Sequence, residues 1–255
     1  MTTDNSLCSR VRAGEPLLGC FLTWPTAGVV ELAAIAGFDF LVLDMEHGFF
    51  TIESIAAMVV AADAAAIPAI VRVPSCAAAE TSRCLDAGAA GLLFPRGDGA
   101  AAIGEAVAAA RYPPEGKRGL GGVRANRYGT VSYAEHVADA NASTLLAAQI
   151  ETPGALEELE AIGRESALDV LFVGPNDLSQ ALGIPGAFSD PRYQEALRRI
   201  AGAAGRAGKA AGIMAGKRDQ VPALHDAGFR FVTVSDRTLL LESGRAWRDA
   251  FDRLP

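Results

Sequence analysis

The stretch FLVLDMEHGFF, residues 40–50, carries the pattern that decides the fold. Four apolar residues follow one another without polar alternation, and the run then meets Asp44, Glu46 and His47. An uninterrupted apolar run is typical of a strand in a parallel sheet that is covered on both faces. Polar side chains directly after such a strand are typical of a functional site at the carboxyl edge of the sheet. The stretch therefore predicts a buried strand that ends at a site.

Similar short apolar runs recur along the chain, and alanine-rich segments of helical character separate them. The runs predict eight strands, at residues 17–22, 39–43, 69–73, 90–94, 145–150, 169–173, 211–214 and 230–235. Eight strands alternating with helices in 255 residues predict an α/β fold, a (β/α)₈ TIM barrel that forms a single domain over residues 1–255. A doubly wound sheet is disfavoured because no GxGxxG follows the first strand.

Composition narrows the class of protein. A net charge of −7 argues against a general nucleic-acid or membrane-surface binder, which needs a basic face. The four cysteines, at positions 8, 20, 76 and 84, form no CxxC pair and have no metal-ligand spacing with histidine. The N-terminus lacks the layout of a secretion signal, and Asp63 and Pro68 interrupt the longest apolar stretch. We therefore expect a cytoplasmic protein.

In a barrel of this type the chemistry lies at the carboxyl ends of the strands. The predicted strands are followed there by these polar residues: Asp44, Glu46, His47, Arg72, Arg96, Gln149, Glu151, Asn176 and Asp177. One polar residue at a strand end means little, since strand ends are polar in any protein. Acids or a base after three strands, with an arginine after a fourth, predict a site.

Six motifs occur in the order found in a known family: DMEHG (44–48), VRVP (71–74), LDAGAAGLLFP (85–95), YPPEGKRG (112–119), QIET (149–152) and GPNDLS (174–179). With them the chain resembles the HpcH/HpaI aldolase/citrate lyase family, class II metal-dependent pyruvate aldolases of the 4-hydroxy-2-oxoheptane-1,7-dioate aldolase type. The resemblance runs from about residue 17 to the last strand. It implies reversible aldol cleavage of 4-hydroxy-2-oxo acids to pyruvate, or a close 2-oxo acid, and an aldehyde, through a metal-stabilised enolate.

Carried over by position, the resemblance implies that Glu151 and Asp177 bind a divalent cation, Mg²⁺ or Mn²⁺ and possibly Co²⁺. Arg72 is implied to contact the pyruvyl oxygen, and His47 to act as the base. An enolate oxygen needs a Lewis acid and a fixed cation, so the chemistry asks for these residue types independently. The alternative for the two acids is a role at helix starts, and Arg72 has an alternative role as an ion-pair partner.

The resemblance also gives secondary roles. Asp44 lies near His47, and Asp86 is a possible partner of His47; because Asp86 precedes the fourth strand, that pairing would cross a subunit interface. Gln149 and Asn176 are implied to line the substrate pocket, with backbone N–H groups of GPND holding the pyruvyl carboxylate. The resemblance further implies a homo-oligomer, a hexamer or trimer of dimers, although the apolar C-terminal segment fits packing on its own barrel equally well.

The chain departs from the family in two places. Phe21 lies where the family usually has tryptophan, and Pro95 is followed by Arg96 instead of an apolar residue. Residues 111–130, long for a connection, carry five basic groups, Arg111, Lys117, Arg118, Arg124 and Arg127, against Glu115. We expect Arg118 to anchor this loop, and Arg96 and Arg124 to face an anionic group of the acceptor aldehyde.

Three other functions remain open from the sequence. An acyl-CoA lyase or a 2-oxo acid decarboxylase of the same superfamily would use the same enolate. A non-catalytic binding protein on the same barrel is disfavoured, because the residues that the chemistry needs are all present at the predicted rim.

Overall fold

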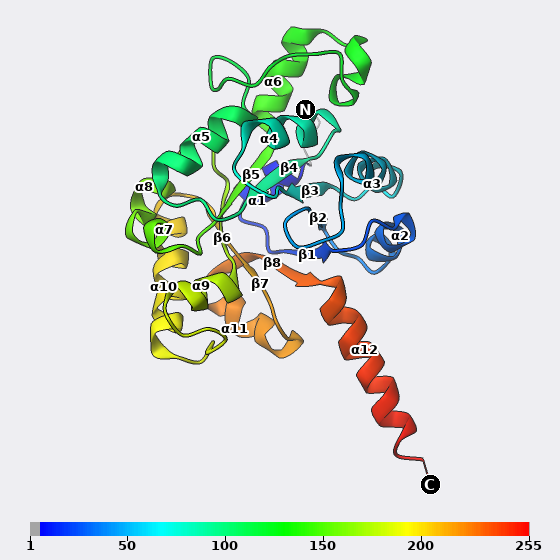
Figure 1. Ribbon diagram of the computed structural model, residues 1–255, viewed down its shortest axis with the longest axis vertical. Helices are drawn as coiled ribbons and strands as arrows, with labels where there is room; N and C mark the ends of the chain where they lie inside the picture. The colour runs from blue at the N-terminus through cyan, green and yellow to red at the C-terminus, as the bar shows by residue number, and fades with distance from the viewer. Residues whose placement is uncertain (1–5, 255) are drawn as a thin grey trace.

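The computed structural model describes residues 6–254 and contains a closed barrel of eight parallel strands (Figure 1). Each strand pairs with the next in the chain, and β1 closes the barrel against β8. The strands are β1 (Leu17–Leu22), β2 (Phe40–Asp44), β3 (Ala69–Arg72), β4 (Gly91–Phe94), β5 (Leu145–Gln149), β6 (Val170–Val173), β7 (Ala210–Met214) and β8 (Phe229–Ser235). The predicted TIM barrel is confirmed, and each predicted strand is found within one residue of its expected bounds.

Helices surround the barrel. They are α1 (Leu7–Arg12), α2 (Ala27–Ile35), α3 (Ile52–Ala64), α4 (Ala78–Asp86), α5 (Ala100–Ala110), α6 (Tyr133–Ser143), α7 (Pro153–Glu157), α8 (Leu159–Gly163), α9 (Pro175–Ala181), α10 (Pro191–Arg206), α11 (Val221–Asp226) and α12 (Asp236–Phe251), with 3₁₀ turns η1 (Arg124–Gly129) and η2 (Arg218–Gln220). Several helix starts are fixed by side-chain caps: Ser6, Thr51, Ser132, Thr152 and Asp190 each accept a hydrogen bond from a backbone N–H of the first turn.

Large aromatic side chains fill the barrel interior. The rings of Phe40 and Phe231 stack with centroids 4.1 Å apart, and Phe172 lies edge-on to Phe231. Gly19 makes room for them, because a β-carbon at that position would overlap the ring of Phe40. The amino-terminal end of the barrel is closed by α1, whose Leu7 joins the same interior cluster. The interior is therefore packed, and open space for a ligand lies at the ends of the strands.

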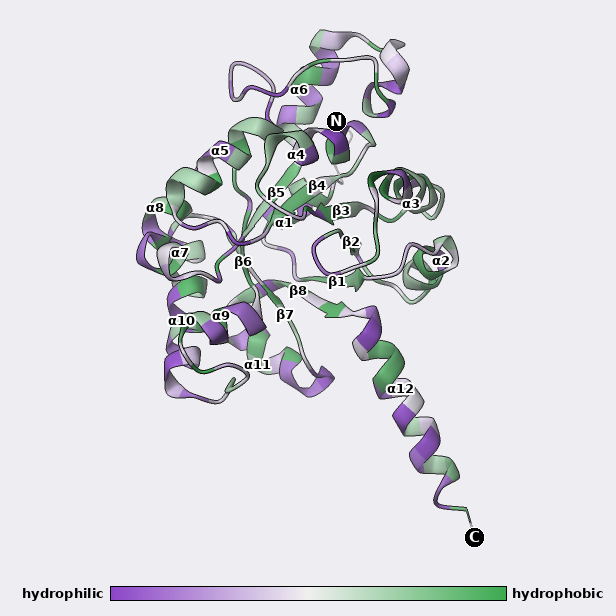
Figure 2. Cartoon of the chain, in the orientation of Figure 1, coloured by the Kyte–Doolittle hydropathy of each residue, from purple (hydrophilic) through white to green (hydrophobic). Residues whose placement is uncertain are grey.

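A second apolar layer lies between the strands and the surrounding helices. The strands are mostly apolar along their length, whereas α12 alternates polar and apolar residues and projects away from the barrel (Figure 2). Within residues 6–254, no helix combines the length and the apolar character that crossing a membrane requires.

Candidate active site

The turn after β2 is organised by one buried carboxylate. Asp44 is 1% exposed, and its Oδ1 accepts hydrogen bonds from the backbone N–H groups of Glu46 and His47, each at 3.1 Å. Arg72, at the end of β3, donates to both oxygens of the same carboxylate, from Nε at 2.8 Å and from Nη2 at 2.6 Å. The ion pair that was the alternative role of Arg72 is thus present. Asp44 orients the guanidinium and also shapes the turn that carries His47.

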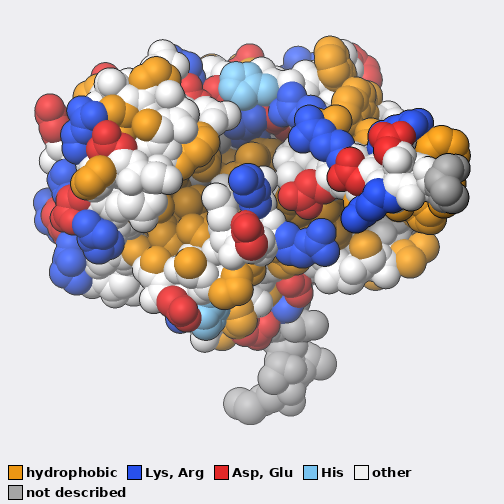
Figure 3. All heavy atoms as spheres, turned by 90° about the horizontal axis from the view of Figure 1, so that it is seen from below, with side chains coloured by type: hydrophobic (Ala, Val, Ile, Leu, Met, Phe, Trp, Pro, Cys, Tyr) orange, Lys and Arg blue, Asp and Glu red, His pale blue; other side chains and the backbone are white. Residues whose placement is uncertain are grey.

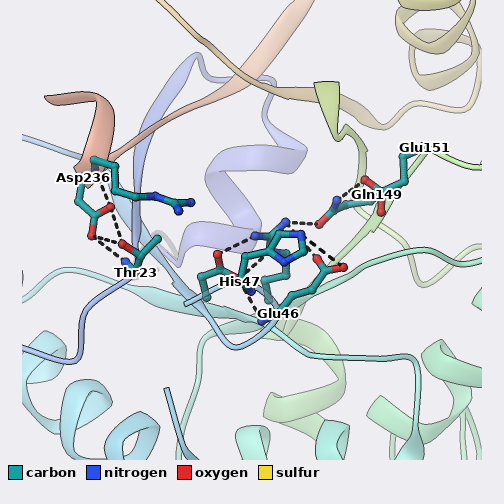
Figure 4. A network of polar contacts seen from close by, with 9 residues as sticks. Thr23, Glu46, His47, Gln149, Glu151 and Asp236 are labelled. Carbon is teal, nitrogen blue, oxygen red and sulfur yellow. Dashed lines mark hydrogen bonds and ion pairs between the residues drawn. The ribbon is translucent and has the colours of Figure 1, made fainter. Parts of the chain in front are cut away.

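The third nitrogen of the guanidinium connects Asp44 to the next strands. Arg72 Nη1 lies 3.1 Å from Oε2 of Glu46 and donates to Oε1 of Gln149 at 3.5 Å. The amide of Gln149 in turn donates from Nε2 to Oε2 of Glu151. Figure 4 shows this chain of contacts, which runs from the end of β2 across β3 to the end of β5. Five of the residues that follow the predicted strands, Asp44, Glu46, Arg72, Gln149 and Glu151, are thus joined in one network.

Glu151 is a buried acid with an incomplete set of partners. Besides the amide of Gln149, its carboxylate accepts a hydrogen bond from the backbone N–H of Arg96 at 2.9 Å. The pKa of Glu151 is raised to about 7, mainly by burial. The two hydrogen bonds lower this pKa, whereas the charges of Asp177 and Glu46 raise it further. Burial also raises the pKa of Glu46, against the attraction of Arg72. Three acids thus face one region, and the charges of Asp177 and Glu46 add to the effect of burial on Glu151.

A cleft opens above Glu151. It has a volume of about 360 Å³, and its lining includes Arg96, Glu151 and Asp177. Asp177 lies in the first turn of α9 with its side chain one-third exposed, and Nη1 of Arg96 lies 3.9 Å from its Oδ1. Asn176, also in that turn, is exposed. Arg96 itself adopts a φ of 52°, which is rare for a residue with a side chain and which turns its N–H toward Glu151.

Gly174 is required for the approach of α9 to Glu151. A β-carbon at Gly174 would overlap Oε2 of Glu151 and crowd Nε2 of Gln149. The glycine therefore brings the helix carrying Asp177 close to the buried acid.

These residues fit a divalent cation. Two carboxylates from adjacent strand ends, one buried and one bordering a solvent-accessible cleft, leave most coordination positions of a hard cation open to a substrate. A cation there would also compensate the charge that burial makes costly on Glu151. Residues 6–254 contain no cluster of three or more His, Cys, Asp or Glu side chains with metal-binding geometry.

His47 differs from these neighbours because it is open to solvent. Its side chain is 54% exposed, and Nε2 lies 4.0 Å from Oε1 of Glu46. Phe21, on β1, is buried, and its ring centroid lies 5.1 Å from Cζ of Arg72. His47 is thus placed at the mouth of the site, whereas Phe21 forms part of its floor.

Asp86 lies outside this network. It ends α4, and its carboxylate pairs with Nη2 of the buried Arg118 at 2.8 Å. Arg124 donates to the Ala87 carbonyl at 3.1 Å and pairs with Asp63 at the end of α3 at 2.5 Å. Arg118 and Arg124 therefore both anchor the 111–130 loop at the helix ends opposite the strand-end site. The expectation that Arg124 faces the acceptor of its own chain is wrong, because those helix ends hold it at the other end of the barrel.

The sequence analysis missed a further contact at the rim. Asp236, directly after β8, accepts hydrogen bonds from the backbone N–H of Thr23 at 2.7 Å and from its hydroxyl at 3.0 Å. The Thr23 carbonyl in turn accepts from the N–H of Phe49 at 2.9 Å. Figure 4 shows the contact of Thr23 with Asp236, and the hydrogen bond from Phe49 links it to the turn that carries His47. The strand-end criterion, applied to the acid after the eighth strand, would have found it.

Comparison with known proteins agrees with this architecture. The family model described as HpcH/HpaI aldolase/citrate lyase matches residues 17–241. The chain is 38% identical to a 4-hydroxy-2-oxovalerate aldolase of Novosphingobium aromaticivorans, over 97% of this chain and 96% of that protein. It is 39% identical to a hydroxypyruvate/pyruvate aldolase of Paraburkholderia phytofirmans, over 92% of each chain.

A solved structure is also similar to this chain. An HpcH/HpaI aldolase/citrate lyase family protein from Burkholderia cenocepacia superposes with a TM-score of 0.91 at 35% identity, covering 96% of this chain and 98% of that one.

Proposed function

Because this chain belongs to the HpcH/HpaI aldolase/citrate lyase family, we propose that its strand-end site performs metal-dependent aldol chemistry on a 2-oxo acid. The enzyme is a carbon–carbon lyase of the class II aldolase type, as are the relatives named above. The proposed reaction is the reversible cleavage of a 4-hydroxy-2-oxo acid to pyruvate, or a close 2-oxo acid, and an aldehyde. Both curated relatives reported above are named aldolases, which favours this reaction over an acyl-CoA lyase, a decarboxylase or a binding protein.

The buried carboxylate of Glu151 supports the metal part of the proposal most directly. Burial raises the pKa of Glu151 to about 7 and the charges of Asp177 and Glu46 add to the rise, so a bound cation would favour the ionised carboxylate. Glu151 and Asp177 would hold that cation, with Mg²⁺ or Mn²⁺ preferred because all the ligands are oxygens. A divalent cation supplies a Lewis acid that polarises a bound carbonyl.

The chain's own residues provide the remaining roles. Arg72 is fixed by Asp44 and directs Nη1 toward Glu46 and Gln149, so it presents a fixed positive charge for the oxygen of the 2-oxo acid. The N–H groups of the first turn of α9, near Asn176, would hold the carboxylate of the same substrate. His47, exposed at the mouth, is placed to move a proton between substrate and solvent.

Arg96 is the proposed contact for the acceptor. Its side chain is 66% exposed beside the cleft, and its Nη1 lies 3.9 Å from Oδ1 of Asp177. Replacement of Arg96 by methionine should raise KM for aldehydes that carry a carboxylate and leave neutral aldehydes little affected. An equal loss for both classes would assign Arg96 to the local fold instead.

We further propose that the protein is a homo-oligomer, a hexamer or trimer of dimers, in which Asp86 of one copy approaches His47 of another. Asp86 is one-third exposed at the barrel end opposite its own His47, so only a neighbouring copy can bring the two together.

The metal proposal is tested by chelation and by an isosteric substitution. EDTA should abolish aldol cleavage, and added Mg²⁺ or Mn²⁺ should restore it; Glu151→Gln should lose metal binding measured by calorimetry. Glu157→Gln, an exposed acid on α7, is the matched control and should bind metal normally. Full turnover in EDTA would assign the two acids to helix capping. Borohydride with pyruvate should leave the protein unmodified, since no lysine belongs to the site.

A further inference from the structure

The loop after β4 is fitted against the segment that follows β5. Three contacts join the two in register: the Arg96 N–H to Oε1 of Glu151 at 2.9 Å, the Thr152 hydroxyl to the Gly97 carbonyl at 3.4 Å, and the Gly154 N–H to Oδ1 of Asp98 at 3.1 Å. A β-carbon at Gly154 would overlap the Asp98 carboxylate, so a glycine is required there for the fit. The loop is thus built against the segment that carries Glu151, and the first of the three contacts reaches the acid itself.

The contact with Glu151 comes from a peptide in a costly conformation. Arg96 has a φ of 52°, a left-handed conformation that is unfavourable for any residue with a β-carbon. Turning the Pro95–Arg96 peptide over would allow a negative φ at Arg96. It would also direct the N–H away from Glu151 and point the Pro95 carbonyl toward the carboxylate. The observed orientation therefore depends on the contacts that hold it.

A thiol holds the other edge of this peptide. In a trans peptide such as this one, the carbonyl and the N–H point in opposite directions, so fixing one of them fixes the other. The Sγ of Cys76, in the turn after β3, donates to the Pro95 carbonyl at 3.3 Å. Burial raises the pKa of the Cys76 thiol, and the charges of Glu151 and Glu46 raise it further. The thiol therefore keeps the proton that it donates at neutral pH.

The side chain of Arg96 takes no part in these two hydrogen bonds. On the face shown in Figure 3, Lys and Arg side chains lie beside Asp and Glu side chains. The guanidinium of Arg96 likewise lies 3.9 Å from Asp177, and its side chain is 66% exposed. The peptide that precedes it instead meets a buried acid and a half-buried thiol. The role of the backbone at this position is thus separable from that of the side chain.

We propose that the Pro95–Arg96 peptide, held by the thiol of Cys76, positions Glu151 for the divalent cation. Cys76 is a positioning residue that acts through this peptide, and its role rests on the metal site proposed above. Without the thiol, the peptide turns over in a larger fraction of the molecules, and in those molecules Glu151 lacks the N–H that orients it. Cation affinity falls in proportion to the fraction of correctly oriented molecules that is lost.

Binding of Mn²⁺ to the whole protein, measured by isothermal titration calorimetry without substrate, tests this role. Cys76→Ala should weaken Mn²⁺ binding by at least about threefold, which is within the range of a single hydrogen bond. Cys76→Ser keeps a donor and should stay closer to the unmodified protein. Cys8→Ala, the same change in α1 at the amino-terminal end of the barrel, is the matched control and should bind Mn²⁺ normally. A smaller loss for Cys76→Ala, or equal losses for its alanine and serine variants, would overturn the role.

Two backgrounds at position 96 test whether Cys76 acts through the peptide. Arg96→Ala and Arg96→Gly both remove the guanidinium beside Asp177, but alanine retains the cost of the left-handed conformation and glycine does not. Adding Cys76→Ala should therefore weaken Mn²⁺ binding more in the alanine background than in the glycine background. Equal losses in the two backgrounds would mean that the thiol acts by another route, and would overturn the role.

The same titrations distinguish failure of this role from failure of the proposed function. If the unmodified protein bound no Mn²⁺, the metal site and the positioning role would be overturned together. If the unmodified protein bound Mn²⁺ and Cys76→Ala bound it equally well, the positioning role alone would be overturned and the proposed aldol reaction would stand.

Discussion

At the scale of single residues, the buried groups of the site are held in fixed positions, whereas His47 is accessible to solvent. Asp44, Arg72 and Glu151 are buried and bonded to one another directly or through Gln149, so their positions are set before any substrate arrives. Preorganised charge of this kind stabilises a developing oxyanion without reorganisation during the reaction. His47 is mostly exposed, which suits a group that exchanges protons with substrate and solvent.

Replacement of His47 by alanine is expected to lower kcat by roughly 10²–10⁴, the usual contribution of a general acid–base group. The control is His225→Ala, since His225 is exposed on α11, away from the strand-end site. Steady-state kinetics with saturating metal would give the result. A kcat near that of the unmodified enzyme would remove His47 from the mechanism.

Gly174 gives a steric prediction about the metal site. Gly174→Ala places a methyl group against Glu151 and Gln149, so the acid must move and metal affinity should fall by at least about tenfold, the range seen when groups around ligands are disturbed. Gly205→Ala, on α10 with open space around it, is the matched control and should bind metal normally while gaining roughly 0.5–1 kcal/mol of stability. Equal metal affinity in both variants would show that the close approach of α9 is unnecessary.

At the scale of elements, the ends of β1 and β8 support the turn after β2. Asp236 at the start of α12 holds Thr23, and Thr23 holds Phe49, two residues beyond His47. The same carboxylate fixes the direction in which α12 leaves the barrel. One contact between elements therefore serves both the site and the helix.

Thr23→Val removes the hydroxyl bond to Asp236 and leaves a partly buried carboxylate less satisfied. We expect a loss of about 1–2 kcal/mol in the free energy of unfolding, measured by urea denaturation, together with a lower kcat from a less fixed His47. Thr130→Val, at an exposed position of the loop, should change stability by less than about 0.5 kcal/mol. A stability loss without any change in kcat would limit Thr23 to a structural role.

At the scale of the whole molecule, the barrel has functional groups at both ends. The strand-end site holds His47, and the opposite end holds Asp86, Arg118 and the anchored loop. If copies meet end to end, the proposed His47–Asp86 pair forms between chains. Head-to-tail contacts of that kind close into rings when the rotation permits.

Complementation between inactive variants tests this arrangement. His47→Ala and Asp86→Ala are each expected to be impaired alone, whereas co-expressed chains should regain activity, because about a quarter of the sites in randomly mixed rings combine an intact His47 with an intact Asp86. Arg245→Ala co-expressed with His47→Ala controls for dilution of the inactive chain. Activity of the mixture no higher than that of the separate variants would place both residues in one chain or remove Asp86 from the site.

The barrel and most of the site were determined by local sequence features. Continuous apolar runs fix buried parallel strands, and the polar residues that follow them must gather at one edge because all eight strands point the same way. That reasoning located Asp44, Arg72, Gln149 and Glu151, which the structure joins in one network. Strand bounds agreed within a residue because the apolar runs end where burial ends.

Only the tertiary structure decided the contacts between distant segments. The charge of the 111–130 loop suggested an anion site, but Asp63 and Ala87, at the ends of two helices, hold Arg124 at the opposite end of the barrel. The spacing of apolar residues in α12 allowed packing on its own barrel, whereas in the structure none of the residues of α12 is buried. Composition and periodicity report burial along one segment, whereas the partner of a charge or an apolar face depends on how the chain closes in space.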